Sequence, residues 1–171
     1  MRLAYIASAE RGRTDRVLSE AAARLGRIGL RLTGVVQTNI QRPQRFHCDM
    51  DLRILPDGPT IGITQDLGDS ARGCRLDPGA LENAVATVEA RLAAGSADLL
   101  MINKFGKHEA EGRGFRPVIG DALARDVPVI LGVNDLNRAA FETFAGGLAE
   151  ELPADVTAIC EWCLNRLASA A

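Results

Sequence analysis

The stretch over residues 7–14, A-S-A-E-R-G-R-T, constrains the fold of this chain more than any other. It fits the phosphate-loop pattern [Ala/Gly]-x-x-x-x-Gly-Lys-[Ser/Thr] at every fixed position except one, where Arg13 replaces the lysine. An apolar run over residues 3–6 predicts a buried strand before it, and apolar residues at helical spacing predict a helix over 15–25 after it. This order of strand, glycine-bearing loop and helix aims backbone N–H groups at an anion. We therefore expect an anion to bind over the loop.

Arg13 leaves the chemistry of the loop open. Lysine is a slim point charge that reaches between phosphates, whereas arginine is a wide planar fork that binds oxyanions with a different shape. A strand-to-helix turn with one glycine and some arginines is also common in α/β proteins without such a site. The loop therefore predicts anion binding more strongly than efficient hydrolysis. Thr14 would offer a hydroxyl to Mg²⁺.

Apolar strands alternate with helical stretches along most of the chain. This alternation predicts a single three-layer α/β domain over residues 1–171, in which helices cover a parallel sheet. The further elements expected are strands over 32–37, 98–103 and 127–133, and helices over 81–94, 115–126, 137–151 and 155–168. Residues 38–76 interrupt the alternation, and two short strands over 51–55 and 60–64, joined by the turn sequence P-D-G-P, predict a β-hairpin insertion there.

A second candidate site follows the strand predicted over 98–103. In phosphate-loop enzymes such a strand ends in an Asp that holds Mg²⁺, often followed by a Glu that polarises water. Here the strand ends in Asn103 and Lys104, a neutral ligand and a side chain that is protonated at pH 7. Poor hydrolysis is therefore expected, unless Glu109 and Glu111 compensate by folding back toward the site.

The loop after this strand is dense in donors and glycines, at the edge where parallel sheets bind ligands. It contains both lysines of the chain, Lys104 and Lys107, together with Arg113. We expect an oxyanion here and favour Lys107 over Lys104 as its ligand, because Lys107 lies farther past the strand end. Arg72 and Arg75, before the helix predicted over 81–94, would swing over the same ligand.

Composition excludes several classes of protein. The net charge of -2 gives no sign of a nucleic-acid-binding surface. No apolar run approaches the ~20 residues needed to span a membrane, and the chain begins with a predicted strand rather than a signal peptide. We therefore expect a cytoplasmic protein whose partner is a small anion or nucleotide, not a nucleic acid or a membrane. The sequence leaves open whether the chain forms a homo-oligomer.

Cysteine and histidine offer two further candidate sites. Cys160 and Cys163 form a C-x-x-C inside a predicted helix, where both are expected to pack inward rather than to bind metal or react. His47 and Cys48 are adjacent in an extended stretch and point to opposite faces, so that a metal would need a distant partner such as His108 or Cys74. Ordinary packing is the simpler interpretation for both groups.

Six short motifs carry a resemblance that covers nearly the whole chain. They are G-V-V-Q at 34–37, C-D-M-D-L at 48–52, T-Q-D-L-G at 64–68, R-G-C-R-L-D-P at 72–78, N-K-F-G-K-H-E-A-E-G at 103–112 and F-A-G-G-L at 144–148. On these motifs the chain resembles a bacterial family of unknown function that is often encoded beside molybdate-transport genes. That family is distantly similar to the thermophile-type phosphate-loop nucleoside triphosphatases, whose strand-end Asp-Glu-x-Gly-Lys resembles residues 103–107 with both acids lost. The resemblance implies a phosphate-loop NTPase-like fold and a link to molybdenum or tungsten metabolism.

Two functions of different classes follow. In the first, the chain binds ATP or GTP with Mg²⁺, which Thr14 and Asn103 contact, and acts as a slow nucleoside triphosphatase or not as an enzyme at all. In the second, it is a non-enzymatic protein that holds molybdate or tungstate, singly or as a cluster, in the same pocket. The candidate ligands of the nucleotide or anion are Ala9, Glu10, Arg11, Gly12, Arg13, Thr14, Arg72, Arg75, Asn103, Lys104, Lys107 and Arg113. Glu109 and Glu111 are the candidates for a catalytic base.

Overall fold

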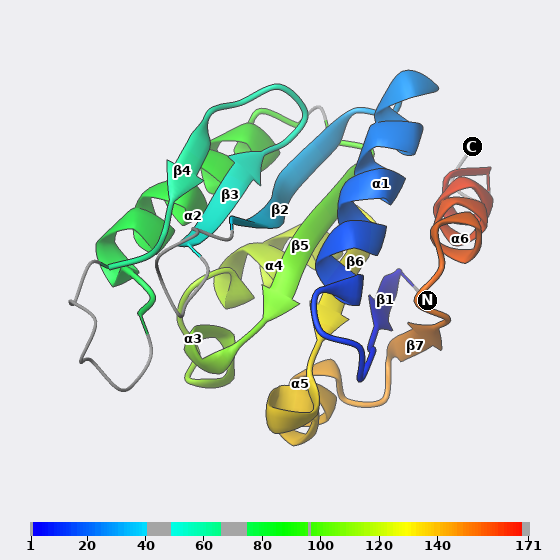
Figure 1. Ribbon diagram of the computed structural model, residues 1–171. Coiled ribbons are helices and arrows are strands. Elements are labelled where there is room, and N and C mark those ends of the chain that lie inside the picture. The colour runs from blue at the N-terminus through cyan, green and yellow to red at the C-terminus, as the bar shows by residue number, and fades with distance from the viewer. Residues whose placement is uncertain (1, 41–48, 66–74, 96, 169–171) are drawn as a thin grey trace.

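A seven-stranded sheet in the order β4-β3-β2-β5-β6-β1-β7 forms the centre of the computed structural model, which describes residues 2–40, 49–65, 75–95 and 97–168 (Figure 1). The strands are β1 (Leu3–Ile6), β2 (Leu32–Ile40), β3 (Asp49–Ile54), β4 (Thr60–Gly62), β5 (Leu99–Phe105), β6 (Val129–Val133) and β7 (Ala149–Leu152). The run β2-β5-β6-β1-β7 is parallel throughout, whereas β3 pairs antiparallel with β2, and β4 pairs antiparallel with β3. The carboxyl ends of five strands therefore meet at one edge of the sheet.

Helices cover both faces of this sheet, so the predicted three-layer α/β fold is confirmed. On one face lie α1 (Arg13–Arg27) and α6 (Val156–Ala168), and on the other lie α2 (Pro78–Ala93), α4 (Arg116–Ala124) and α5 (Arg138–Ala145) (Figure 1). Two short elements complete the fold: α3 (Lys107–Ala110) after β5, and the 3₁₀ helix η1 (Asp135–Asn137) after β6. The Asp77 side chain caps α2, since its carboxylate accepts a hydrogen bond from the N–H of Ala80 at 3.0 Å.

Two separate apolar cores follow from the alternation of side chains along the buried strands. In β5, Leu100 and Ile102 pack toward α2 and α4, whereas Leu99 and Met101 pack toward α1 and α6. A parallel strand covered on both faces needs apolar residues at successive positions, which explains the uninterrupted run at the start of β5. The first polar residue of β5 is Asn103, at the end that reaches the carboxyl edge of the sheet.

The predicted hairpin is present, and it continues the main sheet. β3 pairs antiparallel with β4, and Leu52 lies opposite Ile61. β2 runs past its predicted end at residue 37 as far as Ile40, and β3 pairs antiparallel with it as well. The inserted segment thus widens the sheet at one side. Its parts over 41–48 and 66–74 lie outside the described residues.

The helix predicted over 137–151 is wrong in its second half. α5 ends at Ala145, and residues 149–152 form β7, which pairs parallel with β1 at the edge of the sheet. Gly146 and Gly147 have positive φ angles of 57° and 76°, a backbone conformation that ends the helix. The strand was missed because β7 contains Glu150 and Glu151, and glutamate is uncommon in strands.

Side-chain partners explain how two glutamates sit in β7. The Glu151 carboxylate accepts hydrogen bonds from the Tyr5 hydroxyl at 2.9 Å and from Arg138. The Glu150 carboxylate accepts hydrogen bonds from Trp162 Nε1 at 2.9 Å and from Arg166 at 2.7 Å. These bonds tie β7 to the helices on both faces of the sheet.

Candidate functional site

The loop over residues 7–14 joins β1 to α1 at the carboxyl edge of the sheet. Gly12 is the N-cap residue of α1, with a left-handed backbone (φ 75°, ψ -2°) and no side chain to cap the helix. A Cβ atom at Gly12 would have open space, because the nearest atom is Arg16 Nη1 at 4.0 Å. Glycine is therefore favoured here by its backbone angle and not by crowding. In the first turn of α1 the N–H of Arg13 donates to the Glu10 carbonyl oxygen at 3.2 Å, and no side chain caps the turn, as at helix N-termini that bind anions.

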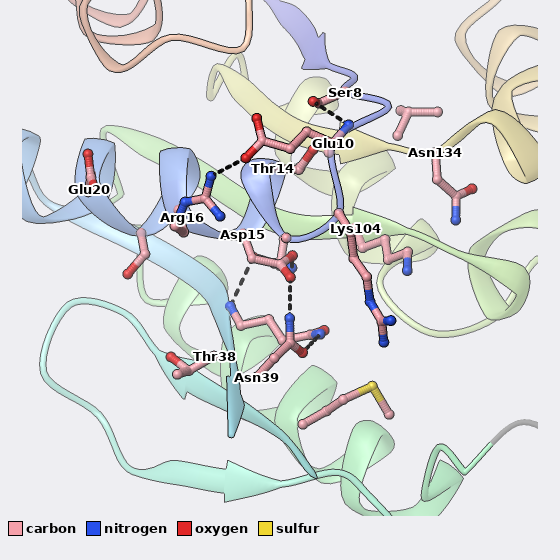
Figure 2. A pocket seen from close by; sticks show the side chains of 18 of the residues that line it. Ser8, Glu10, Thr14, Asp15, Arg16, Glu20, Thr38, Asn39, Lys104 and Asn134 are labelled. Atoms are coloured by element: carbon pink, nitrogen blue, oxygen red, sulfur yellow. Dashed lines mark hydrogen bonds and ion pairs between the residues drawn. The ribbon is translucent and has the colours of Figure 1, made fainter. Parts of the chain in front are cut away.

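A cavity of about 900 Å³ lies over this loop, between α1 and the carboxyl ends of β2, β5 and β6 (Figure 2). Its size is within the range of small-molecule sites. The part of its lining that the sequence predicted consists of Glu10, Arg11, Gly12, Thr14, Arg75, Asn103 and Lys104. The loop, the end of β5 and the segment before α2 therefore meet around one space.

Arg13, at the position of the usual loop lysine, does not line this cavity. Its Nε donates to the carbonyl oxygen of Ala154, before α6, at 3.3 Å, and its Nη1 lies 3.3 Å from the Glu10 carboxylate. Arg13 thus contacts the α6 side of the loop. Ala9 is exposed and also lies outside the lining, and Arg72 lies outside the described residues.

The loop after β5 divides into one cavity residue and a turn with its own contacts. Lys104 lines the cavity, whereas Lys107 does not. The Lys107 side chain is 78% exposed, and its ammonium lies 3.8 Å from the Glu111 carboxylate. Glu111 also accepts a hydrogen bond from Arg113, and this bond is the main cause that lowers the pKa of Glu111. Lys104 is therefore better placed than Lys107 to contact an anion in the cavity.

Glu109 is buried in this turn, with only 4% of its surface exposed. Its Oε2 accepts the N–H of Gly106 at 2.9 Å, and its Oε1 accepts the N–H of Phe115 at 3.0 Å. Gly114 has a φ of 58°, and a Cβ there would lie 2.3 Å from Glu109 Oε1. The carboxylate therefore closes the turn from α3 to α4 and is not directed at the cavity.

A hydrogen-bonded network of four polar side chains crosses the middle of the cavity (Figure 2). Asp15 in the first turn of α1 accepts hydrogen bonds from Asn103 Nδ2 at 2.8 Å and from Asn39 Nδ2 at 2.5 Å. Asn103 is 1% exposed, and its Oδ1 accepts the backbone N–H of Gln37 at 2.9 Å. The Gln37 side chain in turn donates to Asn39 Oδ1 at 2.8 Å. The network joins α1 to the carboxyl ends of β2 and β5.

Gly132 of β6 allows α1 and β5 to approach each other under the cavity. A Cβ at this position would lie 2.5 Å from the Asn103 carbonyl oxygen and 2.5 Å from Thr14 Cγ2. Any larger residue would therefore push apart the first turn of α1 and the end of β5. Thr14 and Asn103, both predicted as site residues, are held close together by this glycine.

Charges of both signs surround the cavity. The basic residues of the lining are Arg11, Arg16, Arg75 and Lys104, and the acidic ones are Glu10, Asp15 and Glu20. The Glu10 carboxylate accepts a hydrogen bond from Arg16 Nη2 at 2.6 Å and a longer one from Arg13. These two bonds, first that of Arg16, hold the pKa of Glu10 below its usual range. The Glu10 carboxylate thus already pairs with arginines at the site where an external anion would bind.

Several cavity residues were not predicted as site residues. The signal for Gln37 and Asn39 was a polar run, Q-T-N, at the end of an apolar strand, where ligands of parallel sheets bind. Asp15 directly follows the motif but was treated only as the start of a helix. Asn134 follows β6 directly and also lines the cavity.

The remaining candidate sites show no metal arrangement in the ranges that the structure describes. Those ranges contain no group of three or more His, Cys, Asp or Glu side chains placed to hold a metal ion. His47, Cys48 and Cys74 lie outside them. Cys160 and Cys163 are buried in the core between α6 and the sheet, and burial raises the pKa of Cys163 to about 12. Both are therefore thiols packed as apolar groups.

No helix in the described part of the chain is long and apolar enough to cross a membrane.

A sequence relative and two solved structures are similar to this chain. The relative is a protein of Bradyrhizobium diazoefficiens named molybdenum import ATP-binding protein ModC 2, which is 36% identical over 148 residues. The match covers 86% of this chain but only 16% of the length of that relative.

The two structures share the fold across nearly the whole chain. THEP1 from the hyperthermophile Aquifex aeolicus matches with a TM-score of 0.68 and 14% identity, over 98% of this chain and 99% of that one. A human cancer-related nucleoside triphosphatase matches with a TM-score of 0.67 and 15% identity, over 99% and 97% of the two chains. The predicted phosphate-loop NTPase-like fold is thereby confirmed. At the level of sequence, a family model matches residues 3–162, and the chain belongs to that family, described as protein of unknown function (DUF2478).

Proposed function

We propose that this chain binds a nucleoside triphosphate, ATP or GTP, together with Mg²⁺ in the cavity over residues 7–14, and that it hydrolyses the nucleotide slowly or not at all. The observation that carries the proposal is Gly12, a left-handed N-cap between β1 and α1 beneath a cavity of about 900 Å³. The names of the relatives support a nucleotide as ligand, because one is an ATP-binding protein and another a nucleoside triphosphatase.

The phosphates would lie against the first turn of α1. The N–H groups of this turn carry a partial positive charge that favours an anion. In other helices a side-chain cap would accept a hydrogen bond from them instead. Lys104, Arg11 and Arg75 line the same cavity and would balance the remaining charge. Thr14 is the residue of the loop whose hydroxyl oxygen suits Mg²⁺, a hard cation that prefers oxygen ligands.

Four observations support slow hydrolysis. Arg13 contacts Ala154 and Glu10 instead of the cavity. Near the carboxyl end of β5, Asn103 has a buried amide whose oxygen already accepts the N–H of Gln37. Glu109 is enclosed by backbone N–H groups, and Glu111 is engaged with Arg113 and Lys107. The residues best placed in other phosphate-loop enzymes to polarise water are therefore replaced or occupied here.

Titration with the fluorescent analogues mant-ATP and mant-GTP tests the proposal, with Mg²⁺ and with EDTA. We expect saturable binding of at least one of them, and protection against thermal unfolding by the parent nucleotide. At 100 times its Kd a ligand adds about 2.7 kcal/mol to stability, a shift that a melting curve resolves. Turnover should stay well below the ~10 s⁻¹ typical of enzymes. Failure to bind either analogue under both conditions would contradict the proposal.

A second proposal concerns the biological context. We infer a link to molybdenum or tungsten metabolism, which the name of the relative from Bradyrhizobium diazoefficiens supports.

The alternative to a nucleotide is an oxyanion as the ligand. Molybdate or tungstate itself would then occupy the cavity, bound by the basic side chains that line it. Melting curves with molybdate, tungstate and, as a control of equal charge and similar shape, sulfate distinguish the two. Stabilisation by molybdate or tungstate but neither by sulfate nor by a nucleotide would favour the oxyanion.

A further inference from the structure

Asp15 places a negative charge in the cavity, and its hydrogen-bond partners in the described chain are neutral. It is half-buried in the first turn of α1, next to Thr14, and its carboxylate accepts hydrogen bonds from two amides, those of Asn103 and Asn39. None of the basic side chains that the structure describes forms an ion pair with it. A polyphosphate bound over the loop would therefore be repelled by Asp15, unless a cation lies between them.

The orientation of Asn103 explains why a carboxylate is present at Asp15. The backbone N–H of Gln37 holds Asn103 Oδ1 at 2.9 Å, so that Nδ2 must face Asp15, from which it is separated by 2.8 Å. The end of β5 thus presents a donor where other phosphate-loop enzymes carry an acid. An acid at this place would oppose Asp15 at hydrogen-bond distance, and two carboxylates so close would repel each other. Asn103 and Asp15 therefore form a complementary pair.

We propose that Asp15 is the carboxylate that holds the divalent cation of the nucleotide, so that the negative charge has moved from the end of β5 to the first turn of α1. The inference rests on the proposed nucleotide site. A carboxylate has about four lone-pair positions, and the two amides occupy only two of them. Asp15 and Thr14 both line the cavity, and a carboxylate together with a hydroxyl is an oxygen donor set suited to Mg²⁺.

The exchange of Asp15 and Asn103 offers a direct test. In the double variant Asp15→Asn/Asn103→Asp the hydrogen bond between the two side chains is kept with donor and acceptor reversed, and the carboxylate introduced at position 103 can still accept the Gln37 N–H. The affinities of mant-ATP and mant-GTP are measured with Mg²⁺ and with EDTA for the wild type, for Asp15→Asn and for the double variant. Asp121→Asn, on the outer face of α4, is the matched control for the loss of an aspartate charge.

Asp15→Asn should change the affinity in opposite directions under the two conditions. With EDTA the nucleotide should bind more tightly than to the wild type, because a like charge has been removed. With Mg²⁺ it should bind about tenfold more weakly, because a ligand of the cation has been lost. The double variant should recover the dependence on Mg²⁺, and Asp121→Asn should match the wild type. A purely structural role of Asp15 would weaken binding under both conditions alike.

Two outcomes overturn the inference, and they are distinguishable. If the wild type binds nucleotide and Asp15→Asn keeps its full dependence on Mg²⁺, Asp15 is not a ligand of the cation, although the nucleotide site stands. If the wild type binds neither analogue under either condition, the proposed function fails and this inference with it. Asp15→Ser, which keeps an uncharged oxygen near Asn103, repeats the measurement if Asp15→Asn does not fold.

Discussion

Two loops leave the carboxyl edge of the sheet, and the sequence predicts an anion site at each, but they are built in opposite ways. Residues 7–14 place their backbone at the cavity, with Gly12 in a left-handed conformation and no side chain that caps α1. Residues 105–114 turn their polar groups toward one another: Glu109 toward backbone N–H groups, and Glu111 toward Arg113 and Lys107. A dense cluster of charged residues is therefore as compatible with a closed turn as with a binding site.

The two predictions differ in how many structural constraints the underlying sequence pattern contains. The first loop requires a glycine and a helix start at fixed positions after a strand, and this geometry alone directs N–H groups outward. The second region was identified from the residue types that gather there. Composition does not say whether a carboxylate faces a ligand or its own backbone, and Glu109 faces its backbone.

Substitution of Gly12 should have the largest effect on binding. In Gly12→Val a β-branched side chain must adopt a φ near 75°, which costs about 1–2 kcal/mol or shifts the backbone to another region. Because there is open space around the position, the fold should survive, but the N–H groups of the loop would no longer converge. We expect the loss of detectable mant-nucleotide binding in a folded protein.

Gly29→Val is the matched control for this prediction. Gly29 follows α1 at its other end, has a φ of 89° and would also have open space around a Cβ. Its substitution should lower the melting temperature as Gly12→Val does, but it should leave the affinity for nucleotide unchanged. Equal affinity losses in both variants would mean that backbone strain alone weakens the site, and unchanged affinity in Gly12→Val would remove the loop from it.

Substitution of Glu109 should break the second loop without touching the site. Glu109→Ala leaves the N–H groups of Gly106 and Phe115 without their acceptor in a buried turn, which should lower the free energy of unfolding by about 3 kcal/mol. Urea unfolding measures this loss. Hydrolysis by the folded fraction should stay as slow as in the wild type, and Glu111→Ala should leave stability near that of the wild type. A selective loss of turnover in Glu109→Ala would instead identify Glu109 as a base.

The sequence predicted most elements of the fold, because buried parallel strands and amphipathic helices have strong local patterns. β1, β5, β6 and the capped helix α2 are found where they were expected. β7 was missed because its two glutamates are satisfied by partners distant in sequence, such as Tyr5 and Trp162. Such partners carry no local signal.

The candidate site could be predicted only in part for the same reason. The motif identified Gly12 and Thr14, since their roles depend on neighbours in the chain. The network from Asp15 through Asn103 to Gln37 depends on β2 and β5 lying side by side, with residues 67 positions apart along the chain brought into register at Leu32 and Leu99. Polar residues at the ends of neighbouring parallel strands are the signal to look for.

Replacement of each of the two lysines by alanine should test whether the cavity or the second loop binds the ligand. Lys104→Ala should weaken nucleotide binding by about 1.5–3 kcal/mol, the contribution of a charge-assisted hydrogen bond. Lys107→Ala should have little effect, because its ammonium is exposed and lies beside Glu111. Arg24→Ala, on the exposed side of α1, controls for the general effect of losing a positive charge. A larger loss in Lys107→Ala than in Lys104→Ala would mean that the second loop moves onto the ligand.

A small gain in affinity should come from substitution of Glu10, the carboxylate of the first loop that pairs with Arg16. Its carboxylate is paired with Arg16 at 2.6 Å, so a bound phosphate must compete with it for that guanidinium. Glu10→Gln should raise the affinity for nucleotide by a factor of about two to five, as expected for the release of an exposed ion pair. Since Glu20 lines the same cavity with no ion pair of its own in the described chain, Glu20→Gln removes a charge without releasing an arginine and should raise the affinity less.

The dependence of this gain on pH follows from the lowered pKa of Glu10. The hydrogen bonds from Arg16 and Arg13 lower the pKa of the Glu10 carboxyl group below its ordinary value of 4.5, so that the carboxylate stays ionised at that pH. The ion pair is therefore fully present above that value, and it is lost only as the pH falls through the lowered pKa. Between pH 6 and 8, the ratio of the affinities of Glu10→Gln and the wild type should stay constant. A ratio that changes across this range would show that a group other than Glu10 controls access to Arg16, and equal gains in Glu10→Gln and Glu20→Gln would reduce the effect to the net charge of the cavity.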